Sequence, residues 1–162
     1  MPEVVIIMGS KADLPQARQI KEALQPYGLS SEMRVASAHK SPAHLLHILQ
    51  AFEAEDERAG LNGPPRVYIT IAGRSNALSG FVDAVVSAPV IACPPYSEKF
   101  GGADIYSSLR MPSGVAPALV LEPDAAALLA AKILGRREQV RAMHAEQTAK
   151  LIADDRALGQ GE

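Results

Sequence analysis

Residues 35–42 read Val35-Ala36-Ser37-Ala38-His39-Lys40-Ser41-Pro42, and one kind of predicted structure gives way to another here. A β-type run over 32–35 ends, small residues follow, and Ser41-Pro42 is a pair typical of a helix N-cap and first turn. The stretch therefore predicts a strand end, a tight loop and a helix start. In an open α/β sheet, loops of this kind hold ligands.

Two side chains in this loop are candidates for chemistry. The imidazole of His39 exchanges protons near neutral pH, and Lys40 beside it carries a fixed positive charge. The alternative is that His39 is an ordinary turn residue with a backbone partner. The octapeptide alone leaves both interpretations open.

The alternation of strand and helix extends on both sides of this stretch. Apolar runs predict strands over 4–8, 31–36, 67–72, 89–93 and 117–121, and amphipathic patterns between them predict helices. The run at 67–72 is almost continuously apolar, which is typical of a strand buried on both faces of a parallel sheet. The sequence predicts an α/β fold of three layers, α/β/α, with a doubly wound, flavodoxin-like parallel sheet of about five strands.

Residues 1–135 are expected to form this α/β domain, and residues 136–162 a C-terminal helical extension. Gly28 and Gly135 are helix stops. The helix that starts at Pro42 is predicted to point these side chains inward: Leu45, Leu46, Ile48, Leu49 and Phe52. The extension is charged and only weakly amphipathic, so we expect it to pack on a neighbouring subunit of a homo-oligomer.

Composition narrows the class of protein. The chain has 162 residues, of which 48% are hydrophobic but only 4% aromatic, so one domain with an aliphatic core is expected. A formal net charge of −2 without a basic run argues against a nucleic-acid partner. The single cysteine, Cys93, allows neither an internal disulfide nor a CxxC metal site. With no membrane-length apolar stretch and no signal peptide, we expect no membrane partner and a cytoplasmic location.

The loop after the first predicted strand carries Gly9, Ser10 and Asp13. Ser10 and Asp13 form S-x-x-D at a helix start, and a plain capping box explains them without a ligand. The functional interpretation adds that the N–H groups of Gly9 and Ser10 face an anion on the helix N-terminus, while Asp13 accepts hydrogen bonds from a ribose diol. The loop is neither a Walker A motif nor a GxGxxG fingerprint.

Two further polar clusters occur in predicted loops. Gly73-Arg74-Ser75-Asn76 follows the buried strand at 67–72 with a guanidinium, a hydroxyl and an amide, although Ser75 also fits a simple helix cap. Ser107-Ser108-Leu109-Arg110 ends in another cation. A nucleotide monophosphate is nearly a dianion at neutral pH, so cations near these loops are candidates to bind it. They are Lys11, Lys40, Arg74 and Arg110. The alternative for some of them is an ion pair with an Asp or Glu on the surface.

Taken together, the motifs resemble the PurE family of de novo purine biosynthesis. The resemblance covers residues 4 to 135 in order. It is carried by Met8-Gly9-Ser10-Lys11-Ala12-Asp13, Ser37-Ala38-His39-Lys40, Ala72-Gly73-Arg74-Ser75-Asn76, Cys93-Pro94-Pro95 and Ser107-Ser108-Leu109-Arg110-Met111-Pro112-Ser113-Gly114. It implies that residues 1–135 are a nucleotide-binding catalytic domain and that the protein is a homo-oligomer, either an octamer or a tetramer.

The family has two branches. In the mutase branch, which moves a carboxylate from N5 to C4 of carboxyaminoimidazole ribonucleotide, Arg follows the motif His and a second His lies in the loop after the third strand. This chain has Lys40 and Arg74-Ser75-Asn76 at those places, which resembles the second branch, 5-aminoimidazole ribonucleotide carboxylase. The mutase is the alternative within the family. A flavodoxin-like module that binds a nucleotide without chemistry is the alternative outside it.

The resemblance also implies roles for individual residues. The carboxylase takes CO2 as co-substrate without metal, biotin or ATP, and His39 matches its catalytic acid–base residue, with Lys40 beside it. The matching substrate-binding positions are Gly9, Ser10, Asp13, Ser37, Ser75, Asn76, Ser107 and Arg110. Of these, Ser75 and Asn76 match the CO2 and ring-amine side. The remaining histidines, His44, His47 and His144, are expected to have no role.

Overall fold

The computed structural model of the chain describes residues 1–60, 63–96 and 102–159. Its strands are β1 (Val4–Met8), β2 (Ser31–Val35), β3 (Val67–Ile71), β4 (Val90–Ala92) and β5 (Ala118–Leu119). Its α-helices are α1 (Leu14–Leu24), α2 (Pro42–Ala59), α3 (Ala77–Val85), α4 (Tyr106–Leu109), α5 (Pro123–Ile133) and α6 (Arg137–Gly159). Short 3-10 turns are η1 (Lys11–Asp13), η2 (Gln25–Tyr27) and η4 (Ala103–Ile105). The predicted alternation is confirmed.

All neighbouring strands in the sheet are parallel, in the order β2-β1-β3-β4-β5. This is the flavodoxin-like order, so the predicted fold class is confirmed. The chain reverses direction across the sheet at β1, which pairs with β2 on one side and β3 on the other. Met8 lies opposite both Val35 and Ile71. Three strands therefore end level, and the loops that follow them meet at the crevice where ligands bind in such sheets.

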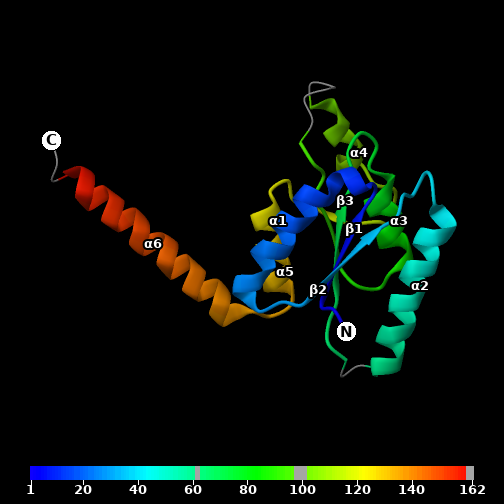
Figure 1. Cartoon of the computed structure of the whole chain (residues 1–162), viewed down its shortest axis with the longest axis horizontal. Coiled ribbons are helices and arrows are strands. Elements are labelled where there is room, and N and C mark those ends of the chain that lie inside the picture. The colour runs from blue at the N-terminus through cyan, green and yellow to red at the C-terminus, as the bar shows by residue number, and fades with distance from the viewer. Residues whose placement is uncertain (61–62, 97–101, 160–162) are drawn as a thin grey trace.

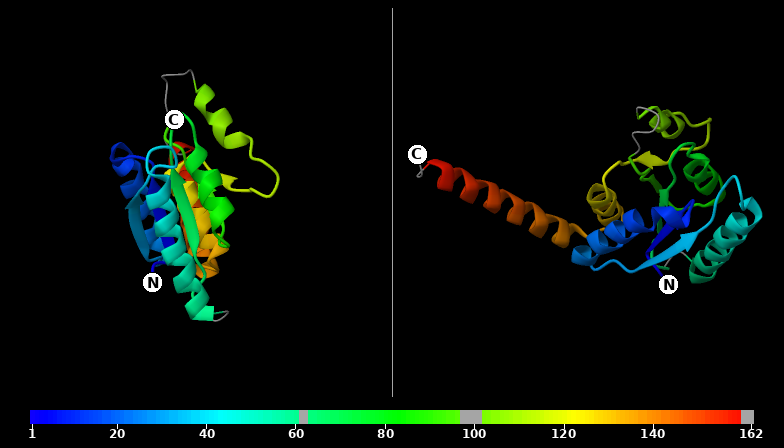
Figure 2. Two further views of the ribbon diagram at one scale, coloured as in Figure 1. Left: turned by 90° about the vertical axis from the view of Figure 1, so that its right-hand side faces the viewer. Right: turned by 45° about the horizontal axis from the view of Figure 1, so that its top comes forward.

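Helices cover both faces of the sheet, which is why the inner strands β1, β3 and β4 are almost entirely apolar and buried. On one face, Val4 and Ile6 of β1 pack with Ile20 of α1 and the alanines of α5. On the other face, Val5 and Ile7 pack against α2 and α3. The two pairs of helices lie on opposite sides of the strands in Figure 1 and Figure 2. The β1 and β3 side chains are completely buried, as the near-continuous apolar runs predict.

Two details differ from the sequence prediction. Leu46 does not point inward but is 36% exposed, because it lies about 100° around α2 from Leu45. Strand β5 is limited to Ala118–Leu119 rather than 117–121. It is an edge strand that pairs with β4 alone, and Pro117 before it has no N–H to donate to the ladder.

A buried arginine ties the far end of α2 to the sheet. The side chain of Arg66, just before β3, is almost fully buried and pairs with Asp56 at 2.8 Å and Glu55 at 3.2 Å. Its guanidinium carbon also lies 4.6 Å from the ring centroid of Phe52. Because α2 is anchored near the amino end of β3, its first turn, and with it the loop that carries His39, has a defined place at the carboxyl ends of the strands.

The last helix leaves the domain. Figure 1 shows α6 running away from the sheet, with only its first turns close to α5 and α1. Val140 is its only buried residue in the part of the chain that the structure describes, whereas Leu151 is 69% exposed. Among the described residues, no helix combines the length and hydropathy needed to cross a bilayer.

Candidate active site

A cleft of about 630 Å³ opens where the first three strands end. The loops after β1, β2 and β3 supply nearly all of its lining. Sequence-predicted residues that line it are Gly9, Ser10, Asp13, Ser37, His39, Lys40 and Ser75. The structure thus brings together residues that are more than 60 positions apart in the chain, as expected for a flavodoxin-like sheet.

The charges of the cleft suit an anionic ligand. Lys40 and Arg74 are its lining cations, and both are exposed. Neither forms an ion pair within the described segments of the chain. Asp13 is the single carboxylate of the lining given by those segments. Of the other cations considered from the sequence, Lys11 and Arg110 do not line the cleft.

The loop after β1 is a tight turn that leads into α1. The N–H of Ala12 donates to Ser10 Oγ at 3.1 Å, and the N–H of Asp13 donates to the Ser10 carbonyl at 3.1 Å. Ser10 therefore caps the turn η1. Its hydroxyl accepts from the N–H two residues later, whereas in a capping box the serine hydroxyl accepts from the N–H three residues later. Burial raises the pKa of the Asp13 carboxyl above its ordinary value, and a hydrogen bond with the Ser10 backbone partly offsets this. A half-buried carboxylate thus faces the cleft, suited to accept hydrogen bonds from a diol.

The loop after β2 is closed by its own residues. The N–H of Ser37 donates to Ser41 Oγ at 2.9 Å, and the N–H of Ser41 donates to the Ser37 carbonyl at 2.9 Å. The N–H of Lys40 donates to Ser37 Oγ at 3.2 Å. Ser41 stands at the predicted N-cap, but its hydroxyl turns back to Ser37 instead of capping α2. This closed loop presents His39, which is exposed and lines the cleft.

The loop after β3 is held differently. Arg74 has a backbone φ of 59°, a left-handed conformation that disfavours a residue with a side chain. Asn76 is 3% exposed, and its Nδ2 donates to Ser108 Oγ at 2.8 Å while its Oδ1 accepts from the N–H of Ser79 at 3.2 Å. Asn76, Ser107 and Arg110 do not line the cleft, so their predicted contact with substrate stays a prediction.

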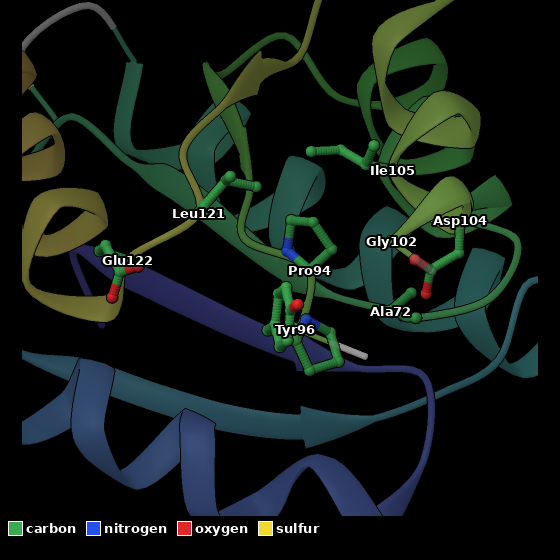
Figure 3. Close-up of a pocket in the computed structure, with 10 residues that line it drawn as sticks. Ala72, Pro94, Tyr96, Gly102, Asp104, Ile105, Leu121 and Glu122 are labelled. Atoms are coloured by element: carbon green, nitrogen blue, oxygen red, sulfur yellow. The ribbon is translucent and has the colours of Figure 1, made fainter. Parts of the chain in front are cut away.

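A smaller hollow of about 210 Å³ adjoins the cleft. Ala72, Gly73 and Pro95 line both spaces. Pro94, Asp104 and Glu122 line the hollow, and Figure 3 shows Pro94 in the middle of the view, with Asp104 on one side and Glu122 on the other. A Cβ on Gly73 would lie 3.3 Å from Pro95 Cγ, so a glycine allows the two loops to approach this closely. Sequence analysis did not find this hollow, because its walls come from segments without a shared motif. The sequence Tyr96–Ala103, which contains Gly101-Gly102, predicts a longer loop after the strand at 89–93, and residues 97–101 of it lie outside the described residues.

The described residues do not provide what a metal site or a reactive thiol requires. Across 1–60, 63–96 and 102–159, no group of three His, Cys, Asp or Glu side chains is arranged to hold a metal ion. Cys93 is buried, and burial raises its thiol pKa to about 11 despite a hydrogen bond from Gln16. This environment is that of a packing residue and disfavours the thiolate that a reactive cysteine needs.

Comparison with known proteins decides the family. A family model described as AIR carboxylase matches residues 3–153, and so spans both the cleft and most of α6. The chain belongs to the AIR carboxylase family. The resemblance that its motifs predict is therefore confirmed.

Members of the AIR carboxylase family from distant organisms are similar to this chain. The phosphoribosylaminoimidazole carboxylase of Archaeoglobus fulgidus is 56% identical over 137 residues, which are 85% of this chain and 71% of the archaeal protein. That of Treponema denticola is 49% identical over 162 residues, covering 97% of this chain and 98% of the other. The human bifunctional phosphoribosylaminoimidazole carboxylase/phosphoribosylaminoimidazole succinocarboxamide synthetase is 41% identical over 82% of this chain, which matches 29% of the human protein. The crystal structure of Treponema denticola PurE matches with a TM-score of 0.91 at 48% identity, covering 98% of this chain and 99% of that one.

Proposed function

We propose that this protein carboxylates 5-aminoimidazole ribonucleotide at C4 with CO2, reversibly, in purine biosynthesis. The observation that carries the proposal is the cleft itself, where His39 and Lys40 stand beside Ser10, Asp13 and Ser75 in a member of the AIR carboxylase family. The named relatives with the highest coverage, from Archaeoglobus fulgidus and Treponema denticola, are phosphoribosylaminoimidazole carboxylases.

His39 is the proposed general acid–base group. The aminoimidazole ring is an enamine-like nucleophile, so C4 forms a bond to the carbon of CO2 and one C=O electron pair moves to oxygen, giving the carboxylate. The neutral imidazole of His39 then takes the proton from C4, and the electrons of that C–H bond restore the aromatic ring. In reverse, protonated His39 delivers a proton to C4 as CO2 leaves. A positioned group of this kind contributes about 10²–10⁴-fold to the rate.

The remaining lining residues bind and orient the substrates. Asp13 accepts hydrogen bonds from the ribose diol, and Ser10 and Gly9 stand at the start of the same turn. Lys40 and Arg74 supply positive charge for the phosphate or the new carboxylate. The hydroxyl of Ser37 accepts a hydrogen bond from the N–H of Lys40, and its own O–H donates a hydrogen bond to the same groups of the ligand. Ser75 lies on the CO2 side. Holding the ring and CO2 in register supplies most of the remaining acceleration, so the proposal needs no metal, biotin or ATP.

Two parallel reactions test the proposal against its alternatives. One contains the enzyme with 5-aminoimidazole ribonucleotide and bicarbonate as the CO2 source, and the other contains the enzyme with the N5-carboxylated nucleotide alone. The carboxylase forms 4-carboxy-5-aminoimidazole ribonucleotide rapidly in the first. Turnover of only the second substrate would establish a mutase instead, and binding without conversion in both would establish a non-catalytic nucleotide-binding module.

The chain is also proposed to work as a homo-oligomer, an octamer or a tetramer, in which α6 packs on a neighbouring subunit. Supporting this, α6 projects from its own domain and carries exposed Leu151 and Ile152. Light scattering after size exclusion is expected to give four or eight chains for the wild type and a smaller species for Leu151→Asp/Ile152→Asp. A monomeric wild type contradicts the proposal. We place the enzyme in the cytoplasm, where a charged nucleotide substrate is retained.

A further inference from the structure

We propose that Asp104, Ser107 and Ser108 are positioning residues for the carboxylation, a role that rests on the function proposed above. They belong to η4 and α4, which contribute no lining residue to the cleft among the residues described. Their hydrogen bonds instead reach the loop after β3. The cleft residue Ser75 lies between the two residues that they hold, Arg74 and Asn76.

Three hydrogen bonds join the two segments across 30 to 32 positions of sequence. The N–H of Arg74 donates to Asp104 Oδ2 at 3.3 Å, and the N–H of Asn76 donates to Ser107 Oγ at 2.9 Å. The Nδ2 of Asn76 donates to Ser108 Oγ at 2.8 Å. We call these three contacts the latch.

The latch is itself braced. Ser107 Oγ donates to the carbonyl of Asp104 at 2.7 Å, so one hydroxyl both accepts from the loop and fixes the segment that holds it. Ser108 is 5% exposed and Asn76 is 3% exposed, so their hydrogen bond is shielded from water. Breaking it would leave a buried amide proton without a partner, which is more costly than losing an exposed contact.

The loop needs such support because of its backbone. Arg74 is the one non-glycine residue with positive φ in the described chain, and at 59° it is left-handed. Without the contacts made by Arg74 itself and by Asn76, the backbone at Arg74 would relax toward negative φ and carry Ser75 with it. A shift of about 1 Å in a positioning group can cost about 100-fold in rate. The latch therefore acts on the rate through Ser75, while the ribose side at Ser10 and Asp13 stays in place.

The test compares Ser107→Ala with Ser107→Thr in the full-length protein. Alanine removes both hydrogen bonds of the hydroxyl, and threonine keeps them. We expect kcat of Ser107→Ala to fall by about 10- to 100-fold with KM for the nucleotide within about threefold, and Ser107→Thr to recover kcat to within about threefold of wild type. Asp104→Ala and Asp104→Asn form a second pair with the same expectation, because Asp104 is partly exposed and its replacement leaves the core intact.

Ser87→Ala is the matched control. The hydroxyl of Ser87 also bonds to a residue far away in sequence, donating to Glu53 Oε2 at 3.0 Å, but Ser87 lies between α3 and β4, at the amino ends of the strands and so opposite to the cleft. We expect its Tm to fall about as much as that of Ser107→Ala, with kcat within about twofold of wild type.

Three results would overturn the latch. These are an unchanged kcat in Ser107→Ala and Asp104→Ala, an equal loss in the alanine and conservative variants, or an equal loss in Ser87→Ala. Wild-type turnover of 5-aminoimidazole ribonucleotide separates this outcome from failure of the proposed function: an inactive wild type contradicts the function, whereas an active wild type with fully active latch variants contradicts only the latch.

Discussion

The two loops that face each other across the switch point of the sheet are held in opposite ways. The loop after β2, which presents His39, is closed by hydrogen bonds between residues three or four positions apart, from Ser37 to Ser41. The loop after β3, which presents Ser75, has one local hydrogen bond, from the N–H of Ser79 to Asn76, and three to the distant residues Asp104, Ser107 and Ser108. One loop is defined by its own sequence, and the other depends on a distant segment.

This difference matches the tasks proposed for the two loops. A proton-transfer group must sit accurately relative to one carbon, and a short closed loop gives it a fixed base. The CO2 side must fit a small substrate at the meeting point of several segments, so its geometry follows the packing of η4 and α4. Substitutions in the loop after β2 should therefore abolish proton transfer, whereas substitutions that disturb the loop after β3 should misplace CO2.

The largest expected effect comes from removing the group that the local loop presents. We expect His39→Ala to lose turnover by about 10²–10⁴-fold, since no acid–base group would then serve C4. Nucleotide affinity, measured by calorimetry, should stay within about tenfold, or about 1.4 kcal/mol. His44→Ala, on the exposed face of α2, is the control and should remain active. Normal turnover by His39→Ala would contradict the proposal that His39 is the general acid–base group.

The second effect separates charge from chemistry within the same loop. Lys40→Ala should weaken nucleotide binding about tenfold or more as well as lower kcat, because a charge-assisted contact is worth about 1.5–3 kcal/mol. Steady-state kinetics that report KM and kcat separately will distinguish it from His39→Ala. Lys21→Ala, exposed on α1, controls for net charge. Lower kcat with unchanged KM in Lys40→Ala would mean that Lys40 takes no part in binding.

The third effect tests whether the local loop is held as its hydrogen bonds indicate. Ser41→Ala removes the acceptor for the Ser37 N–H and the donor to the Ser37 carbonyl. We expect the free energy of unfolding in urea to fall by about 1–2 kcal/mol and kcat to fall about tenfold, because His39 loses its fixed base. Unchanged kcat at the lower stability would show that the loop needs no such closure.

The smallest effect concerns Asp13, on the loop beside both of the others. Burial raises its pKa above 3.8, so the stability that its protonation gives is present below that pH and is lost as pH rises through the folded-state pKa. At pH 7 we therefore expect Asp13→Asn to raise Tm by about 1–2 °C while weakening nucleotide binding. The gain in Tm should vanish near pH 3. A lower Tm at pH 7 would mean that the carboxylate is stabilised in the free protein.

The same contrast explains how far sequence analysis reached. The periodicity of apolar residues predicts the strands and helices, and so the fold, because this periodicity is a property of neighbouring residues. The tight loop at 37–41 is likewise predicted from a few adjacent residues. Leu46 was placed wrongly because apolar character alone does not give the angle of a residue on its helix. The family resemblance implies a substrate contact for Ser107, which stays a prediction, and nothing in the neighbouring sequence indicates that its hydroxyl accepts a hydrogen bond from the N–H of Asn76, 31 positions away.

The most direct test of the account is the position of one imidazole relative to one carbon. A crystal structure of the full-length protein with 4-carboxy-5-aminoimidazole ribonucleotide should place a ring nitrogen of His39 about 3–3.5 Å from C4, or connect the two through a single water molecule that is hydrogen-bonded to the imidazole. A nucleotide bound in the cleft with His39 turned away from C4, and no water between them, would contradict the proposed mechanism.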